Sequence, residues 1–374
     1  MVLQVEKFQD SCKKILGAVD TDSALKNVAF GYDTLELEAS GKVLHLNVTN
    51  GEYFVSIDLD LDAEETLRAV VDAKLFLALV SKITTKTVEL TTTDNALIVK
   101  ANGTYKFPLK YDVDKMVVLP KILVNNVTST FTVDASTLMS ILNNNTREVV
   151  STIITKPVQK LYYIDNEGCL TFTNMSACVN SFTLPTTNKV LLTQKLVKLF
   201  KLFRDGDVKV ILGFENVGGV TQTRILLEQD AIKVTSILTS DVAMLNSIPV
   251  SAIRGRANKL FDHQVTFDTK NFLETLDRLL LFDTTNSLNK GIGVFEFGAT
   301  SVNIYDSRKA NHEEVAYASG TCENTYVANL DLESIKAILL STDSQVFTMS
   351  FGDNQAIVVS FNNIKNVVSQ KVIR

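Results

Sequence analysis

A short strand that runs straight into a helix recurs three times in this sequence of 374 residues, at intervals of about 130 residues. The openings begin near Val2, Thr130 and Val265. Repetition at a fixed period is typical of a chain made from copies of one supersecondary unit. A single unit is too small to bury its own helix, so neighbouring units must pack together. The repeat therefore predicts three similar blocks.

Most of the sequence between these openings has the pattern of antiparallel strands. Apolar and polar residues alternate in Thr34–Glu38, Val43–Val48 and Thr87–Thr91. A period of two residues places one side of a strand in a core and the other side in solvent. Turn-forming pairs such as Asn50-Gly51 and Asn102-Gly103 separate these runs. The chain is therefore expected to be rich in short antiparallel strands.

Six helices are predicted against this background, two in each block. Four of them follow a residue whose side chain can accept the first free backbone N–H groups: Asp72, Asp134, Thr193 and Asp331. The predicted helices cover residues 8–19, 72–83, 134–143, 192–204, 269–282 and 331–341. The expected fold class is α+β, with three similar domains that each contain two units of one helix and an antiparallel sheet. The expected domains are 1–122, 123–249 and 250–374.

The helix at 192–204 divides most clearly into two faces. Its buried stripe is predicted to contain Leu196, Leu199, Phe200 and Phe203. At about 100° per residue, Lys198 and Lys201 lie almost opposite this stripe. The first helix repeats the arrangement, with a stripe of Phe8, Cys12, Ile15 and Val19. On the second helix, Lys74 is expected to lie opposite Leu75, Phe76 and Val80.

Basic residues accumulate on or beside the helices, away from the apolar stripes. They are Lys13, Lys14, Lys74, Arg147, Lys195, Lys198, Lys201, Arg204, Lys270 and Arg278. Glu274 lies between the last two and reduces the positive charge there. Each face on its own can be an ordinary solvated helix surface. The net charge of −5 excludes a protein coated with basic residues, but several basic helices can still create one positive surface.

Enzymatic and metal-binding motifs are absent from the sequence. The Gly-rich stretch Gly213–Gly219 lacks the Lys-Ser/Thr of a phosphate-binding loop. Four scattered Cys and three distant His have no zinc-type spacing, and are expected to be ordinary reduced thiols and isolated imidazoles. Neither a signal peptide nor an apolar run of about 18 residues occurs. The sequence therefore predicts a non-enzymatic, cytoplasmic protein without a cofactor, a bound metal or a membrane association.

The whole chain resembles the beta sliding clamps of bacterial replicative DNA polymerases. The repeat carries most of the resemblance, together with Tyr105–Leu109, the tyrosine-pair strand Leu161–Ile164 and the junction at Ile248-Pro249. Two stretches depart from the family. Thr173–Cys178 replaces a Thr-Asp-Gly-His-Arg-Leu stretch and keeps only the Thr, and the end of the chain reads Lys-Val-Ile-Arg in place of Met-Pro-Met-Arg. These departures indicate a divergent member, of bacterial or phage origin.

This resemblance implies a head-to-tail homodimeric ring, in which the helices of both chains line a hole for double-stranded DNA. Binding would be independent of sequence, and the ring would tether a DNA polymerase and a clamp loader through short peptide motifs. The positions matching the family's peptide groove are Ile164, Thr173, Cys178, Val179, Val242, Ser247, Ile373 and Arg374. Those matching its subunit contact are Phe107, Leu109, Leu281 and Phe282. Ordinary core or surface positions remain an alternative for each of these residues, although Leu279–Phe282 is apolar on all sides, which favours an interface.

A second hypothesis is a virion or surface structural protein made of repeated β-rich domains, without a role on DNA. Such a protein would have no reason to gather basic residues on its helices. A nucleic-acid-modifying enzyme is disfavoured, because no catalytic constellation occurs in the sequence.

Overall fold

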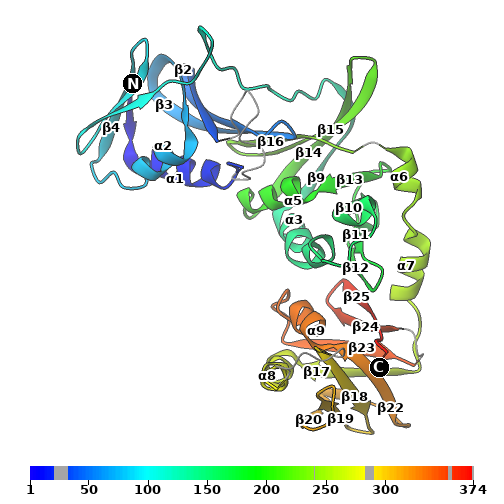
Figure 1. Ribbon diagram of the computed structural model, residues 1–374. Helices are drawn as coiled ribbons and strands as arrows, with labels where there is room; N and C mark the ends of the chain where they lie inside the picture. The colour runs from blue at the N-terminus through cyan, green and yellow to red at the C-terminus, as the bar shows by residue number, and fades with distance from the viewer. Residues whose placement is uncertain (21–32, 240, 283–289, 353–355, 373–374) are drawn as a thin grey trace. The chain divides into compact units, whose positions relative to one another are not determined.

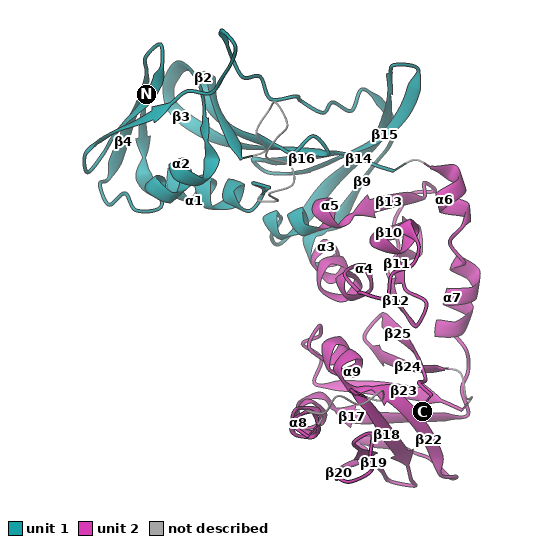
Figure 2. Ribbon diagram, viewed as in Figure 1, with its two compact units in different colours: residues 1–136, 198–240 teal, residues 137–197, 241–374 magenta. Residues whose placement is uncertain are grey.

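The computed structural model of this protein describes residues 1–20, 33–239, 241–282, 290–352 and 356–372 (Figure 1). The chain forms two compact units. The first unit contains residues 1–136 and 198–240, and the second contains residues 137–197 and 241–374 (Figure 2). Both units combine antiparallel sheets with helices, as the sequence predicts. The expected division into three domains stays a prediction.

Two main sheets build the first unit. The four-stranded sheet has the order β1 (Val2–Gln4), β4 (Thr87–Thr92), β5 (Ala96–Lys100), β6 (Thr104–Pro108). The six-stranded sheet has the order β2 (Thr34–Thr49), β3 (Tyr53–Asp72), β16 (Ile232–Ile237), β15 (Val220–Gln229), β14 (Asp207–Val217), β9 (Asn126–Asp134). A small ribbon is formed by β7 (Tyr111–Asp112) and β8 (Lys115–Met116).

Two helices of the first unit, α1 (Val5–Leu16) and α2 (Ala73–Val80), lie side by side against strands β2 and β3 (Figure 1). Their aromatic side chains fix the packing. Phe8 of α1 meets Phe76 of α2 edge to face, with ring centroids 6.2 Å apart. Phe76 in turn meets Phe107 of β6 at 5.3 Å. Aromatic pairs at these separations contribute beyond the apolar area that they bury.

The second unit contains a nine-stranded sheet and a four-stranded sheet. The larger has the order β13 (Val190–Thr193), β10 (Leu161–Asp165), β11 (Gly168–Phe172), β12 (Ser176–Ser181), β25 (Ile364–Ser369), β24 (Ala356–Phe361), β23 (Val346–Phe351), β17 (His263–Asp268), β21 (Ser319–Thr321). The smaller has the order β20 (His312–Ala316), β19 (Ser301–Tyr305), β18 (Ile292–Phe297), β22 (Tyr326–Asp331).

Helices α8 (Thr269–Leu280) and α9 (Leu332–Leu339) lie side by side in this unit and cover a core rich in phenylalanine. Phe267, Phe272 and Phe347 are packed with ring centroids 4.8–5.4 Å apart. Two short helices that the sequence did not predict, α6 (Val242–Asn246) and α7 (Val250–Ala257), follow the second block. Both helices pack apolar side chains, among them Leu245 and Ile253, against a cluster that comes largely from the nine-stranded sheet.

All six predicted helices are confirmed. They are α1, α2, α8 and α9, together with a composite third helix and a composite fourth helix. The third consists of α3 (Ala135–Ser140), a π-helical turn at Ile141–Asn145 and α4 (Thr146–Val149). The fourth consists of α5 (Gln194–Lys198) and a 3₁₀ turn at Leu199–Leu202. One predicted core position is wrong: Leu75 is 59% exposed, because Phe76 and Val80 direct the buried face of α2 away from it.

The four predicted capping residues are confirmed as well. Asp72, Asp134 and Asp331 each accept a hydrogen bond of 2.7 Å from a backbone N–H in the first turn of the following helix. Thr193 Oγ1 accepts one of 3.3 Å from the N–H of Leu196. Each cap satisfies a donor that the helix itself cannot pair.

The internal repeat reappears in the pairing of strands. The three openings are β1 into α1, β9 into α3 and β17 into α8. Each opening strand pairs antiparallel with the strand that follows the second helix of its own block: β1 with β4, β9 with β14 and β17 with β23. The three blocks thus share this pairing of strands.

Candidate nucleic-acid interface and partner sites

The first helix presents its basic residues on the side away from the core. Phe8 and Ile15 are fully buried, whereas Lys13 is exposed. Lys14 is about one third exposed, and its Nζ lies 2.7 Å from a carboxylate oxygen of Asp10 one turn earlier. The division between an apolar face and a basic face is the one that the sequence predicts for α1.

The fourth helix places further cations beside the end of α1. Lys198, Lys201 and Arg204 are exposed, while Leu196, Leu199, Phe200 and Phe203 of the predicted stripe are buried. A side-chain carbon at Gly17 would lie 3.3 Å from Cε of Lys201, so the 3₁₀ turn meets the end of α1. Among the residues that the structure describes, Lys13, Lys198, Lys201 and Arg204 have no carboxylate within 4.0 Å.

Two more predicted cations have distinct surroundings. Lys74 on α2 is exposed, and its charge helps Lys110, the nearer cation, to hold the pKa of Asp33 below its usual range. Lys195 on α5 is half-buried. Of the cations on the fourth helix, Lys195 is therefore less exposed than Lys198 and Lys201.

The predicted cations of the second unit are engaged with acidic or carbonyl oxygens. Lys270 lies 4.0 Å from Glu274. Arg278 donates two hydrogen bonds of 2.7 Å to Glu313 of β20. Since these carboxylates neutralise the nearby charge, the second-unit helices offer less attraction to a phosphate backbone than the first-unit helices do.

Arg147 has an internal role in the structure. Its guanidinium donates to the buried carboxylate of Glu148 and, at 3.1 Å, to the carbonyl oxygen of Ser334 on α9. Burial raises the pKa of Glu148, and the neighbouring Arg147 opposes that rise. Arg147 therefore joins the third helix to α9.

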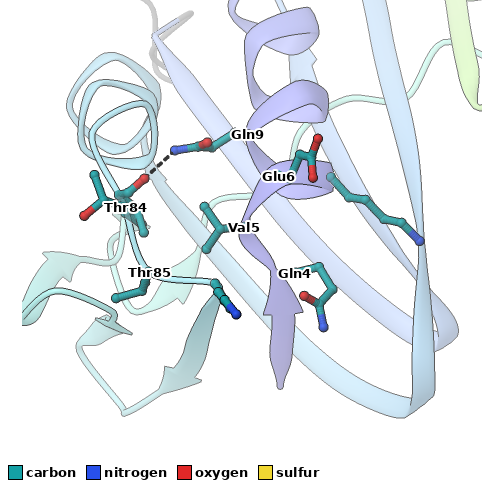
Figure 3. A pocket seen from close by; sticks show the side chains of 9 residues that line it. Gln4, Val5, Glu6, Gln9, Thr84 and Thr85 are labelled. Carbon is teal, nitrogen blue, oxygen red and sulfur yellow. Dashed lines mark hydrogen bonds between the residues drawn. The ribbon is translucent and has the colours of Figure 1, made fainter.

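Two basic residues that the sequence patterns did not indicate, one on α1 and one just before β4, lie near the start of α1. Lys7 and Lys86 are exposed and border a cavity of about 730 Å³, into which the side chains of Figure 3 project. Gln9 fixes one wall, because its Nε2 donates a hydrogen bond of 2.8 Å to the carbonyl oxygen of Ile83. Lys7 precedes Lys14 by two helical turns, so a helical-wheel comparison could have found it.

The four positions of the expected subunit contact fall into two classes. Phe107 and Leu109 are 5% and 8% exposed and belong to the core of the first unit. Leu281 and Phe282, at the end of α8, are 71% and 58% exposed. Helix α8, which these two residues follow, contacts β20, the edge strand of its four-stranded sheet. Exposed apolar groups and an open sheet edge are both typical of an interface.

The positions of the expected peptide groove are only partly brought together. Val179 faces an apolar cluster that packs against α6 and α7, but Cys178, one residue earlier, faces the phenylalanine core. Ile164 is buried and alternates with Tyr163 of the cluster, so it too points to the other side of its strand. Ile373 and Arg374 lie outside the described residues.

The other positions of the expected peptide groove lie in a turn and on an exposed helix. Thr173 Oγ1 accepts hydrogen bonds from the backbone N–H groups of Met175 and Ser176, at 3.1 and 3.0 Å. Val242 on α6 is 66% exposed, and Ser247 at its end is exposed as well. On α6, Val242 is therefore exposed, whereas Met244 and Leu245 pack against the apolar cluster.

The cysteines and the other side chains that could bind a metal have unreactive or scattered positions in the described residues. All four cysteines are buried, and burial raises the pKa of the Cys12, Cys169 and Cys178 thiols, which keeps them protonated and unreactive. Among the described residues, no three His, Cys, Asp or Glu side chains gather in a metal-binding arrangement. None of the described helices combines the length and the apolar character needed to cross a membrane.

Solved structures with the same architecture are bacterial clamps. The DNA polymerase sliding clamp of Bacillus subtilis superposes with a TM-score of 0.80 at 14% identity, over 100% of this chain and 99% of that chain. The DNA polymerase III subunit beta of Pseudomonas aeruginosa gives 0.79 at 15% identity, over 99% of each chain. The chain has the sliding-clamp fold. The beta subunit from Thermotoga maritima agrees, with a TM-score of 0.79 at 13% identity over 100% of this chain and 99% of that chain.

The clamp fold is much better preserved than the sequence. No protein-family model matches the chain. The curated relatives include the ribonucleoside-diphosphate reductase subunit alpha of two Helicobacter pylori strains, at 26% identity over 178 residues. That match covers 41% of this chain and 22% of the reductase, so the chain spans about a fifth of those relatives. The clamp fold, in contrast, accounts for the chain from end to end.

Proposed function

We propose that the protein is a DNA sliding clamp, a non-enzymatic ring that encircles double-stranded DNA in the cytoplasm and tethers a DNA polymerase to it. The observation that carries the proposal is a rule of strand pairing between blocks. The last strand of the second block, β16, pairs with β3 of the first block. The last strand of the third block, β25, pairs in the same way with β12 of the second block.

The same rule leaves one strand open at each end of the series. The last strand in the four-stranded sheet of the first block is β6, and the third-block strand equivalent to β3 and β12 is β20. In the described chain, β6 pairs only with β5, and β20 pairs only with β19. A second copy can supply the missing neighbour, because its β20 fits β6 and its β6 fits β20. Repeated head to tail, this pairing closes a ring and removes both open edges.

The two edges have complementary chemistry. Lys106 is exposed on β6, and Glu314 is exposed on β20. Leu281 and Phe282, which follow the helix that contacts β20, add exposed apolar side chains. Opposite charges favour the encounter of two edges, and apolar burial holds them together. A homodimer, as the family resemblance implies, places three blocks of each chain in the ring.

Four cations on α1 and on or just after the fourth helix have no carboxylate within 4.0 Å among the described residues, and they support the DNA-binding part of the proposal. Lys13, Lys198, Lys201 and Arg204 attract phosphates without reading base edges. Contacts of this kind carry no sequence register, so a closed ring can slide while it stays linked to the duplex. A polymerase and a clamp loader would bind elsewhere, through short peptides with apolar anchors.

Retention on DNA of different topology tests the proposal. The protein, loaded by a clamp loader on nicked circular DNA, should be retained during gel filtration at a salt concentration that abolishes electrostatic binding, and should be released when the circle is cut once. Light scattering should give about twice the 41.3 kDa chain mass. A monomeric protein that leaves circular and linear DNA equally fast would support the alternative of a β-rich structural protein.

Charge exchange tests the proposed contact between β6 and β20. Lys106→Glu should weaken the dimer, because it places two acidic edges against each other and they repel. The added substitution Glu314→Lys should restore the dimer. Leu281→Glu together with Phe282→Glu should give a folded monomer, since both side chains are exposed within the chain. Glu52→Lys, away from both edges, is the control for a general effect of charge.

A further inference from the structure

A cavity of about 190 Å³ lies on the nine-stranded sheet in the third block. One wall is the chain segment 257–261, which ends α7 and leads towards β17, and the floor comes from β17, β23, β24 and β25. Val265, Met349 and Val359 of these strands belong to the phenylalanine core. Because successive residues of a strand face opposite sides, the cavity lies on the face of the sheet away from that core.

The floor of the cavity is polar, unlike the sheet face beneath α7, where Val367 of β25 belongs to an apolar cluster. Ser350 of β23 is paired with Gln264 of β17. Ser360 of β24 is paired with Lys365 of β25. All four of these polar side chains line the cavity. The floor therefore presents an amide, two hydroxyl groups and an ammonium group to a ligand.

Two lysines give the cavity a positive charge. Lys365 Nζ donates a hydrogen bond of 2.8 Å to Asn258 Oδ1, which holds the ammonium group at the cavity wall. Lys259 also lines the cavity, and its Nζ lies 5.5 Å from the centroid of the Phe261 ring. Among the described residues that line the cavity, none is acidic. The lining therefore favours an anion over a cation.

Two further donors of the floor are available to such an anion. Within the described part of the chain, neither the Ser350 hydroxyl nor the Gln264 amide makes a side-chain hydrogen bond. The carboxylate nearest in sequence, that of Asp262, is not part of the lining and lies against Gly352, where an added Cβ would be 3.0 Å from Asp262 Oδ2. Ammonium and hydroxyl donors that converge on one cavity suit a group with several acceptor oxygens, such as a phosphate.

We propose that this cavity binds a small phosphate ester, and that a nucleoside monophosphate is the class of ligand that fits. The ammonium groups of Lys259 and Lys365 and the Ser350 hydroxyl bind the phosphate. Phe261 and Val358 also line the cavity and form an apolar wall for the planar base. None of these residues belongs to the cations that are proposed to attract duplex DNA, so the inference is independent of the proposed function.

Calorimetric titration of the full chain with three probes tests this assignment. The nucleotide dAMP should bind, because it supplies both a phosphate and a base. Inorganic phosphate should bind at least about tenfold more weakly than dAMP, since it leaves the apolar wall unfilled. Deoxyadenosine, which lacks the phosphate, should give no measurable heat of binding. Equal affinities for dAMP and deoxyadenosine, or for dAMP and phosphate, would overturn the assignment.

Substitutions in the floor locate the bound phosphate. Lys365→Gln should weaken the binding of dAMP by about tenfold, because a charge-assisted hydrogen bond is lost. Ser350→Ala removes only a hydroxyl group and should weaken binding by about threefold or more, even if Lys365→Gln disturbs the contact with Asn258. Asp262→Asn should strengthen binding by about twofold, since it removes a nearby negative charge without changing the lining.

Lys270→Gln is the matched control for Lys365→Gln, because it removes the same charge from α8, where the Lys270 side chain is 87% exposed. This variant should bind dAMP like the unchanged chain. Equal losses in the Lys365→Gln and Lys270→Gln chains would reveal a general effect of net charge and would overturn the inference. An undiminished affinity in both the Lys365→Gln and the Ser350→Ala chains would overturn it as well.

Discussion

The helices of the two units have similar apolar faces but differ in how their cations are used. In the first unit, Lys13 and Lys201 extend into solvent without a carboxylate within 4.0 Å among the described residues. In the second unit, Arg278 is held by Glu313, and Lys336 lies 2.8 Å from Asp277. Basic residues on a helix thus do not by themselves make a phosphate-binding surface. The neighbouring carboxylates decide which of them remain available, so the first unit should supply most of the attraction for DNA.

The largest expected effect tests whether the two units are separate in stability as well as in charge. Phe8→Ala in the first unit and Phe272→Ala in the second each remove a fully buried ring and should each lower the free energy of unfolding by about 3–5 kcal/mol. Calorimetry should show that each variant lowers a different transition. Leu260→Ala, at a position that is 93% exposed, is the control. A single transition lowered equally by both variants would contradict independent units.

The charge difference is tested by reversals in the two units. Lys198→Glu with Lys201→Glu should weaken binding to a short linear duplex by about tenfold or more, because two phosphate contacts are lost. Each lost contact should also reduce the magnitude of the slope of log K against log salt by about 0.9. Lys270→Glu with Lys336→Glu in the second unit should have a smaller effect. Fluorescence anisotropy at several salt concentrations measures both. Equal losses would show that the ion pairs of the second unit open on DNA.

A pH titration examines the second-unit ion pair between Arg254 and Asp165 beneath α7. Burial tends to raise the pKa of Asp165, but the hydrogen bonds from Arg254 hold it below its usual range. A carboxyl group with a lowered pKa stabilises the folded state above its unfolded pKa, near 4, and loses this contribution as the pH falls through the folded pKa.

Hydrogen exchange of α7 between pH 6 and pH 3 should therefore accelerate below about pH 4, beyond the ordinary dependence of exchange chemistry on pH. The charged or titratable groups around Asp165 are Arg254, Glu167, Tyr163 and Cys169. Asp165→Asn should remove this step from the profile, and Glu167→Gln should leave it in place. A step that persists in the Asp165→Asn chain would assign it to another group.

The smallest expected effect comes from a substitution that leaves a second-unit cation, Arg278, without its carboxylate partner, as Lys13 and Lys201 are in the first unit among the described residues. Glu313→Gln removes the carboxylate that holds Arg278 and should increase the affinity for a linear duplex by about twofold, on the order of one screened charge contact. Glu314→Gln on the same strand is the matched control, because its Oε1 accepts from Ser301 and not from Arg278. An unchanged affinity would mean that α8 does not approach the DNA backbone.

Helices and strands could be predicted from the sequence wherever apolar residues recurred at a regular spacing. A helix that is stabilised mainly by contacts with distant parts of the chain could not be predicted in this way. The stripe through Phe8 and Ile15 and the caps such as Asp72 were visible in the sequence because they depend on residues a few positions apart. Helix α7 was missed because the apolar stripe of Val250–Ala257 is short and Gly255 lies within it. Its structure depends on Asp165, which lies 89 residues earlier in the chain.

The candidate site divides in the same way. The basic faces of α1 and of the fourth helix follow from local spacing, and the exposure of Lys13 and Lys201 agrees with it. The pairing of Arg278 with Glu313, 35 residues away, depends on how β20 lies against α8, and no local pattern indicates it. Alternation along a strand also separates Cys178 from Val179, which a resemblance in sequence treats as neighbours in one groove.

The pairings of β16 with β3 and of β25 with β12 have a mechanical consequence for the proposed ring. Both of these joints lie within one polypeptide, where the backbone limits how far the blocks can separate. The joint between β6 and β20 would have no such tether, and each of these strands is only five residues long. A protein that opens the ring to admit a duplex would therefore separate β6 from β20. Opening at either of the other two joints would leave the blocks connected by the polypeptide.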